Sequence, residues 1–145
     1  MALKILRHPV NPVQGLERIR ALGIAIVVLH ALITIPHGIA HSNLNIQMNS
    51  WQNIYILVVI NLLPLVALVL IWRRKRPGFL ILLFSMAGSF LFGGFYHFVA
   101  AGPDNVASLA SHPWTHTFQW TAVLLAVSEA AGFFIGLRGS SSVNP

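Results

Sequence analysis

Histidines are the residues of this chain whose type and spacing could do chemistry. Seven occur among 145 residues, and there is no cysteine. Three of them, His41, His97 and His116, lie 21 or 22 residues from the basic boundary of a long apolar run. At about 1.5 Å per helical residue, three different helices therefore bring an imidazole to about the same height. His112, four residues before His116, is placed just above this level.

His37 joins this group because it shares a helix face with His41. His30, Thr34, His37 and His41 follow an i, i+4, i+7, i+11 pattern, which forms one stripe along one helix. The rest of the run is nearly all apolar. A polar stripe in such a span is expected to face the bundle interior or a water-filled cavity.

The chemistry that these side chains indicate is transition-metal binding. Imidazole nitrogens suit Zn, Cu and Fe, whereas the single nearby acid makes Ca²⁺ and Mg²⁺ poor candidates. Because the ligands must be neutral, binding should weaken as the pH falls through about 6. The predicted metal ligands are His37, His41, His97, His112 and His116.

Two other interpretations of the histidines stay open. In the first, they are interfacial side chains that hydrogen-bond to loop backbone and water without a metal. In the second, two of them at equal height hold a haem b between facing helices. The haem interpretation is less favoured than a bare ion, because that end has no Arg or Lys to pair with the propionates.

A second polar layer is expected deeper in the bundle. Glu129 lies nine residues before Arg138 and His30 lies ten after Arg20, so both sit about 13–15 Å from the basic boundary. A mid-membrane carboxylate is costly unless it is neutral or paired. The sequence therefore predicts a pair of His30 and Glu129, as a structural hydrogen bond or a proton relay. Glu129 and His116 are about 140° apart on an ideal helix, so the two layers are expected to be separate or linked by water.

These side chains need elements that hold them in an apolar environment. The chain is 56% hydrophobic and 8% charged, and residues 21–72, 77–103 and 105–128 contain no Asp, Glu, Lys or Arg. The sequence predicts an all-α integral membrane protein, a four-helix antiparallel bundle within residues 21–138. The spans are expected at about residues 21–40, 54–72, 78–101 and 117–137. Residues 1–20 are expected to form an interfacial arm and residues 139–145 a flexible tail.

The basic residues predict the orientation of this bundle. All nine flank the apolar runs, while the connections at residues 41–53 and 102–114 contain none. Because Lys and Arg in short loops stay in the cytoplasm, both termini are predicted to be cytoplasmic. The short basic segments lack interleaved aromatics, so nucleic-acid binding is not expected. Pro36 and Pro64 fall inside the first two spans, where they should kink the helices and free backbone carbonyls.

The function predicted from these features is metal binding at the outer, non-cytoplasmic end of a multi-pass membrane protein. One alternative is a small ion- or proton-linked transporter or channel subunit. Another is a structural or assembly subunit of a larger membrane complex. The expected partner is the lipid bilayer, with a homo-oligomer or a larger membrane complex as further partners. No residue pattern names a reaction, so the sequence does not decide whether the protein is an enzyme.

Overall fold

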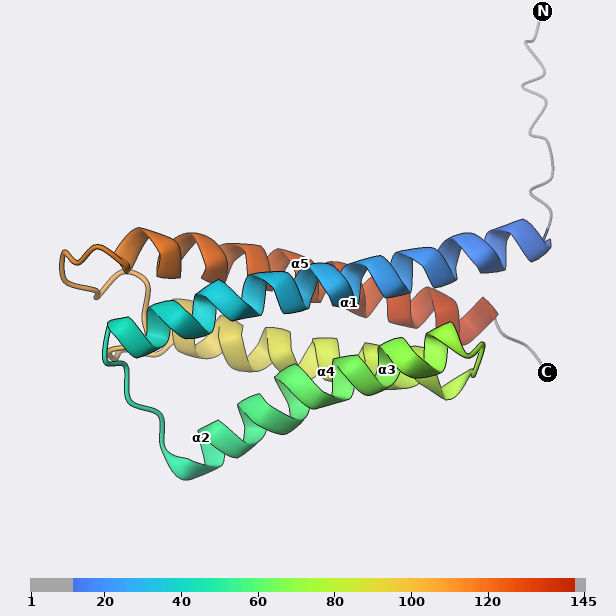
Figure 1. The fold of residues 1–145 in the computed structure, drawn as a ribbon. Helices are drawn as coiled ribbons and strands as arrows, with labels where there is room; N and C mark the ends of the chain where they lie inside the picture. The colour runs from blue at the N-terminus through green and yellow to red at the C-terminus, as the bar shows by residue number, and fades with distance from the viewer. Residues whose placement is uncertain (1–11, 143–145) are drawn as a thin grey trace, which may run out of the picture.

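Helices account for most of the chain in a computed structural model, which describes residues 12–142. The first long helix is α1, and the second consists of α2, the π-helix η1 and α3 in continuous succession. The third consists of α4 and the π-helix η2, and the fourth is α5. Their bounds are Pro12–Asn43 for α1, Ser50–Tyr55 for α2, Ile56–Leu62 for η1, Leu63–Trp72 for α3, Pro77–Gly94 for α4, Phe95–Val99 for η2 and Thr115–Ser142 for α5. The prediction of four antiparallel apolar helices is confirmed (Figure 1).

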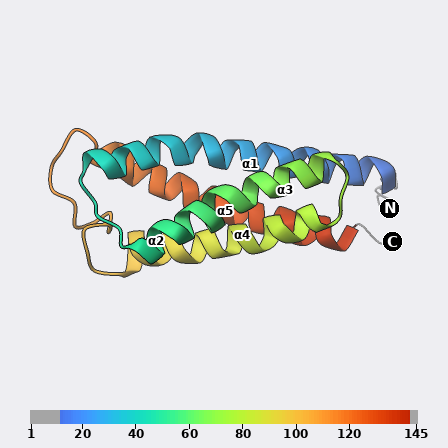
Figure 2. The ribbon, with the colours of Figure 1, turned by 60° about the horizontal axis from the view of Figure 1, so that its bottom comes forward.

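The two ends of the bundle differ in character. The short turn between α3 and α4 carries basic residues 73–76 and lies at the same end as the start of α1 and the end of α5 (Figure 1). We call this the basic end. The longer connections, residues 44–49 and 100–114, lie at the opposite end, which we call the loop end. At the loop end α2 lies apart from α1 in both side views (Figures 1 and 2).

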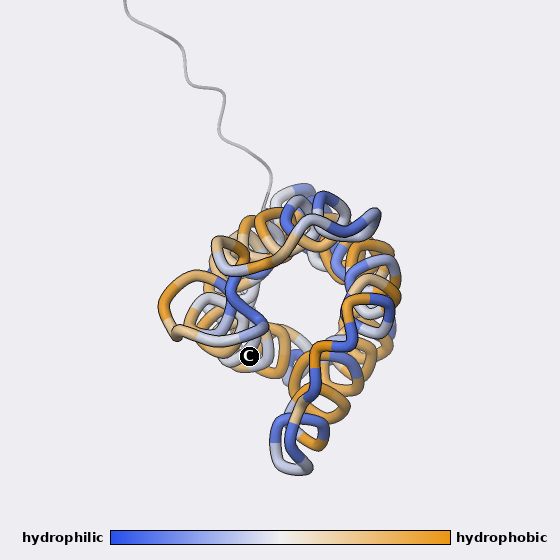
Figure 3. The backbone as a smooth tube through the Cα atoms, turned by 90° about the vertical axis from the view of Figure 1, so that its left-hand side faces the viewer, coloured by the Kyte–Doolittle hydropathy of each residue, from blue (hydrophilic) through white to orange (hydrophobic). Residues whose placement is uncertain are grey.

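The outer surface of the bundle is apolar along its length. All four helices are long and apolar enough to cross a membrane. Large side chains such as Phe84 and Leu91 are each 70% exposed. Seen from the loop end, the helices lie around a common axis, with hydrophobic residues predominating along them and hydrophilic residues prominent in the connections (Figure 3). This surface is the kind that a bilayer solvates.

The helices extend beyond the spans expected from the sequence. Helix α1 begins at Pro12, which fits a first helical turn because proline has no N–H to leave unpaired there. Part of the expected arm is therefore helical in this structure. Helix α5 likewise continues to Ser142. The remainder of the arm and of the tail, residues 1–11 and 143–145, lies outside the described residues.

Pro64 shapes the middle of the second long helix. It is the second residue of α3, which follows directly on the π-helix η1, and it lacks the N–H that would normally bond to the carbonyl of Ile60. As the sequence predicts, this carbonyl is free for another donor. The Nε2 atom of His30 lies 3.2 Å from it and takes that role. The proline thus ties the second helix to α1 through a side chain.

The basic-end half of the bundle is filled by apolar side chains. Its fully buried members include Val27, Ile71, Leu82 and Met86. Helices α4 and α5 approach closely here because glycines of α5 face the backbone and side chains of α4. A Cβ atom on Gly136 would lie 2.7 Å from the backbone nitrogen of Leu83 and one on Gly132 would lie 2.7 Å from Cγ of Met86. Small residues permit this contact in the way that membrane helices commonly use.

A second, smaller cluster covers the loop end. Ala40, Ile46 and Phe118 are buried there. Partly buried side chains from both long connections pack on them, namely Leu44, Met48, Val106, Leu109 and Trp114. The histidines of α1 and η2 therefore lie between this cover and the apolar half below.

Candidate metal centre

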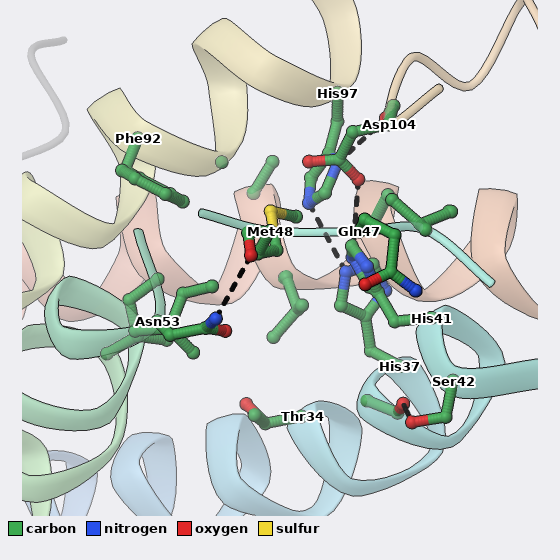
Figure 4. A pocket seen from close by; sticks show the side chains of 18 of the residues that line it. Thr34, His37, His41, Ser42, Gln47, Met48, Asn53, Phe92, His97 and Asp104 are labelled. Carbon is green, nitrogen blue, oxygen red and sulfur yellow. Dashed lines mark hydrogen bonds and ion pairs between the residues drawn. The ribbon is translucent and has the colours of Figure 1, made fainter. Parts of the chain in front are cut away.

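Three of the predicted ligands meet inside the loop-end half of the bundle. Helix α1 supplies His37 and His41, and η2 supplies His97. Each offers one nitrogen, and these three atoms all lie within 4.8 Å of one another. His37 and His97 are each 7% exposed, and His41 is partly buried. Figure 4 shows the three imidazoles beside Asp104 at one side of a cavity.

The π-helix η2 sets the position of His97. Its last turn is closed by the N–H of Ala100, which bonds to the carbonyl of Phe95 at 2.7 Å. The chain then leaves the helix and folds back, so that the N–H of Val106 bonds to the carbonyl of His97 at 3.0 Å. This return places Asp104 over the ring of His97. Single π-turns of this kind occur frequently at functional sites.

One arrangement of the hydrogen bonds around His37 leaves its Nε2 without a proton. Its Nδ1 lies 2.9 Å from Oγ1 of Thr121. That hydroxyl donates its own proton to the carbonyl of Thr117, at 2.6 Å, within helix α5. When the hydroxyl donates to Thr117, its oxygen accepts from Nδ1–H of His37. In that arrangement neutral His37 has a bare Nε2.

The same reasoning applies to His97. Its Nδ1 lies 3.1 Å from the backbone carbonyl of Asp104 and 3.1 Å from the carboxylate Oδ1 of that residue. Both neighbours are acceptors only, so Nδ1 carries the proton and Nε2 is bare. The Nε2 atoms of His37 and His97 lie 3.2 Å apart. With the proton of each ring on Nδ1, two lone pairs face each other in a buried place, and an electropositive species between them would stabilise this arrangement; with the proton of His37 on Nε2, the same two nitrogens share a hydrogen bond.

The separation of these two nitrogens suits a metal ion. With metal–nitrogen bonds of about 2.0–2.1 Å and a tetrahedral angle, two imidazole nitrogens lie about 3.3 Å apart. The observed distance of 3.2 Å between Nε2 of His37 and Nε2 of His97 is close to this value. His41 supplies a third nitrogen from the same stripe of α1. The buried group could therefore hold a metal ion.

Asp104 supports two of the three imidazoles. Its Oδ1 lies 3.1 Å from Nδ1 of His97 and 3.3 Å from Nε2 of His41, although neither contact is aligned as a hydrogen bond. The residue is 6% exposed. Carboxylates in this position commonly orient metal-bound imidazoles and raise their basicity. The negative charge would also offset part of the charge of a bound cation.

Phe118 forms the wall behind the imidazoles. It is fully buried and stacks on His37, with ring centroids 4.9 Å apart and planes at 27°. Its ring also contacts His41 and His97, at centroid distances of 4.9 and 5.3 Å. A rigid aromatic wall limits the rotation of all three rings and keeps their nitrogens together.

A cavity of about 390 Å³ extends from the imidazoles toward the middle of the bundle. Its polar lining includes Thr34, Asn45, Asn53 and Glu129. Apolar side chains such as Ile60 and Leu125 complete the wall. None of the described residues that line it is Lys or Arg, so the site has no fixed positive side chain to attract an anion.

The predicted mid-membrane pair consists of neighbours in the structure. Nδ1 of His30 lies 4.0 Å from Oε1 of Glu129, and both residues are almost fully buried. This distance exceeds that of a hydrogen bond. Within the described part of the chain, Nδ1 of His30 has no hydrogen-bond partner.

His112 and His116 are not brought into the group. Both are exposed, and Nδ1 of His112 accepts a local bond from the N–H of Trp114 at 3.3 Å. The buried stripe of α5 runs through Phe118 to Glu129. On a helix with 100° per residue, His116 points away from that stripe. A shared height was therefore not enough to bring His116 to the centre.

Three residues around the imidazoles were not among the predicted ligands or pair, namely Asp104, Phe118 and Thr121. Asp104 had a detectable signal, because it is the only acid between residues 18 and 128. Thr121 and Phe118 lie on the same face of α5 as Glu129, so the assumption that Glu129 points inward would have located them. The contact between Asp104 and His97 depends on the return of the loop, for which the sequence has no clear signal.

Comparisons with protein-family models, with curated proteins and with solved structures give no match for this chain.

Proposed function

We propose that this chain is a multi-pass membrane protein that binds one transition-metal ion through His37, His41 and His97. Zn, Cu and Fe are the candidate metals, because an all-imidazole set with a supporting carboxylate suits borderline ions. The observation that carries the proposal is the meeting of three imidazole nitrogens within 4.8 Å of one another, with the buried Nε2 atoms of His37 and His97 facing each other at 3.2 Å. Asp104 and Thr121 would act as the groups that orient the imidazoles.

A bare ion fits these residues better than haem does. Axial imidazoles of a haem lie on opposite sides of a porphyrin, which separates them by the thickness of the macrocycle. Here the facing nitrogens of His37 and His97 leave no room for a ring between them. His116, another partner considered for axial ligation, is exposed on the far side of α5.

We place the metal centre on the non-cytoplasmic side of the membrane. The support comes from the basic residues, which gather at the basic end, while the loop connections at residues 44–49 and 100–114 carry no Lys or Arg. The lipid bilayer is the partner that the apolar outer surface favours.

A static site is better supported than ion conduction. A conducting path would have to continue from the cavity to the basic end. That half is occupied by fully buried apolar side chains, including Ile71, Leu82 and Met86. We therefore propose that the ion binds and leaves by the loop end.

Elemental analysis of the purified protein tests the proposal. The full chain would be reconstituted in nanodiscs, loaded with Zn²⁺, Cu²⁺ or Fe²⁺ in turn and desalted. Wild type should retain close to one equivalent of at least one of these metals. His97→Ala should lose it, because η2 offers no second imidazole to replace the missing one.

His116→Ala is the matched control, since it removes an exposed histidine without touching the group. It should retain the metal like wild type, and circular dichroism should show equal helix content in all three proteins. A wild type that retains none of the three metals would refute the proposal. Equal retention by His97→Ala would refute the assignment of this residue as a ligand.

A further inference from the structure

Glu129 is the one acid of this chain that lies in the middle of the bundle. It is 3% exposed, and its carboxyl faces the cavity. Gly93 lies between the carboxyl group of Glu129 and the imidazole of His97. A Cβ atom on Gly93 would lie 3.9 Å from Oε2 of Glu129 and 3.6 Å from Cδ2 of His97. The carboxyl group therefore has its own position below the candidate metal centre.

His30 presents a bare nitrogen to this carboxyl group. Its Nε2 lies 3.2 Å from the carbonyl of Ile60, which can only accept, so the ring proton is on Nε2. Nδ1 is then an unprotonated acceptor, and it is buried without a partner in the described chain. It lies 4.0 Å from Oε1 of Glu129. A carboxylate there would be a second acceptor facing the first.

The surroundings offer no cation to balance a carboxylate. Helix α1 contributes His30, which lies beside Glu129, and the two imidazoles His37 and His41 that line the cavity. η2 contributes His97, and the loop beyond it contributes another acid, Asp104. No Lys or Arg is found among the described residues that line the cavity. An isolated carboxylate in such a place bears the desolvation penalty of a buried ion without a compensating charge.

We propose that Glu129 and His30 form a proton-binding site at the closed end of the cavity. The site holds one proton, with Glu129 as a carboxylic acid whose O–H points toward Nδ1 of His30. A small rotation of the carboxyl group, or one bridging water in the cavity, brings the two groups into hydrogen bonding. The ligand of this site is a proton, and the site does not depend on a metal at the imidazoles.

Protons reach this site from the loop end. The cavity continues from Glu129 past the imidazoles to Asn45 and Asn53 near the loop connections. Toward the basic end the way is closed, because Met86 packs on Gly132, one turn beyond Glu129, and Val27 is fully buried one turn before His30. Exchange of the bound proton is therefore expected with one side of the membrane.

Infrared spectroscopy can test directly whether Glu129 is protonated, because the chain has only three acidic side chains. A protonated carboxyl group has a C=O band above the amide bands, and this band shifts in D₂O. Wild type in nanodiscs with a chelator at neutral pH should show one such band. Glu129→Gln should lose it, whereas Glu17→Gln, which changes an exposed acid near the basic end, should keep it.

Two results would overturn the proposal. One is a wild-type spectrum without a carboxylic acid band at neutral pH, and the other is an unchanged band in Glu129→Gln. His30→Leu tests the pairing, since leucine offers no acceptor and loss of the imidazole should move the band to higher frequency without removing it. An unmoved band would exclude His30 as the partner. Because the chelator removes metal ions, the infrared result does not depend on whether the imidazoles bind a metal. The two proposals can therefore fail separately.

Discussion

Asp104 is the carboxylate that lies against two imidazoles, and its charge is the feature that a substitution can remove most cleanly. Asp104→Asn keeps the size of the side chain but removes the negative charge beside His97 and His41. We expect the affinity for the metal to fall by about 10–100-fold, which is usual for the loss of a group that orients metal ligands. Competition with a chromophoric chelator measures this change.

Glu17→Gln is the control for this experiment. It also removes one acid, but from the basic end, where Glu17 pairs with Arg20 and Arg74. Its metal affinity should equal that of wild type. An Asp104→Asn variant that binds as tightly as wild type would show that the carboxylate does not support the imidazoles.

The three imidazoles also predict a pH dependence of metal binding. Each must be neutral to coordinate, so protons compete with the metal and occupancy should fall as the pH falls. Raising the pH should strengthen binding until all three rings are neutral, after which affinity should level off. Equilibrium dialysis across a pH series measures this, with circular dichroism to confirm that the fold persists. Occupancy that rises on acidification would contradict an imidazole ligand set.

The residue types of the centre were predictable from the sequence, but their final grouping was not. His37, His41 and His97 follow from a polar stripe in α1 and from equal heights along the spans. His116 satisfied the height criterion and nevertheless lies outside the group, because height ignores the angle around the helix axis. The position of Asp104 depends on a long connection whose path has no periodic signal.

At the scale of elements, the close contact of α4 and α5 gives a second kind of prediction. A Cβ atom on Gly136 would lie within 2.8 Å of the backbone of Leu83, so Gly136→Ala forces the helices apart. We expect a loss of about 1–3 kcal/mol in the free energy of unfolding, as for other overpacked sites. Unfolding of the detergent-solubilised protein in a series of SDS mole fractions measures it.

Gly38→Ala is the matched control in α1, since a Cβ atom there would meet nothing within 4 Å. This substitution should leave stability unchanged or raise it by about 0.5–1 kcal/mol, because alanine loses less entropy than glycine in a helix. Equal effects of the two substitutions would contradict the role of Gly136 in helix packing.

Local sequence signals predicted where the helices lie, but they did not predict the π-helical turns within them. Long uncharged runs predicted all four, and Pro64 predicted a freed carbonyl in the second. The π-helices η1 and η2 were not predicted, because the sequence pattern distinguishes poorly between one hydrogen-bond spacing and the next. The helix ends extend further than the apolar runs because polar residues continue a helix once it has begun.

For the whole molecule, the arrangement of basic residues predicts its orientation. Reporter enzymes fused at Lys75 and after Arg138 should be cytoplasmic, whereas reporters inserted within residues 44–49 or 102–114 should not. A glycosylation or alkaline-phosphatase series measures this. A translocated basic turn would reverse the side on which we place the metal centre, without altering its geometry.

The number of helices and their apolar surface were therefore predictable from the positions of the uncharged apolar runs, whereas the uneven filling of the interior was not. Gly132 and Gly136 allow dense packing at the basic end, and the divergence of α2 leaves space at the loop end. Both depend on how helices meet in three dimensions, and hydropathy along the chain carries little information about such contacts.

The buried apolar side chains of the basic end, Met86 among them, have a consequence for what the protein could sense. In a membrane, an ion bound at the proposed centre would equilibrate through the loop end with one compartment, so that its occupancy would follow the free concentration there and be independent of the concentration across the bilayer. Such a site performs no work against a gradient, and neither a gradient nor a voltage is needed to load it. Through occupancy at equilibrium, the chain would report on the chemistry of a single compartment.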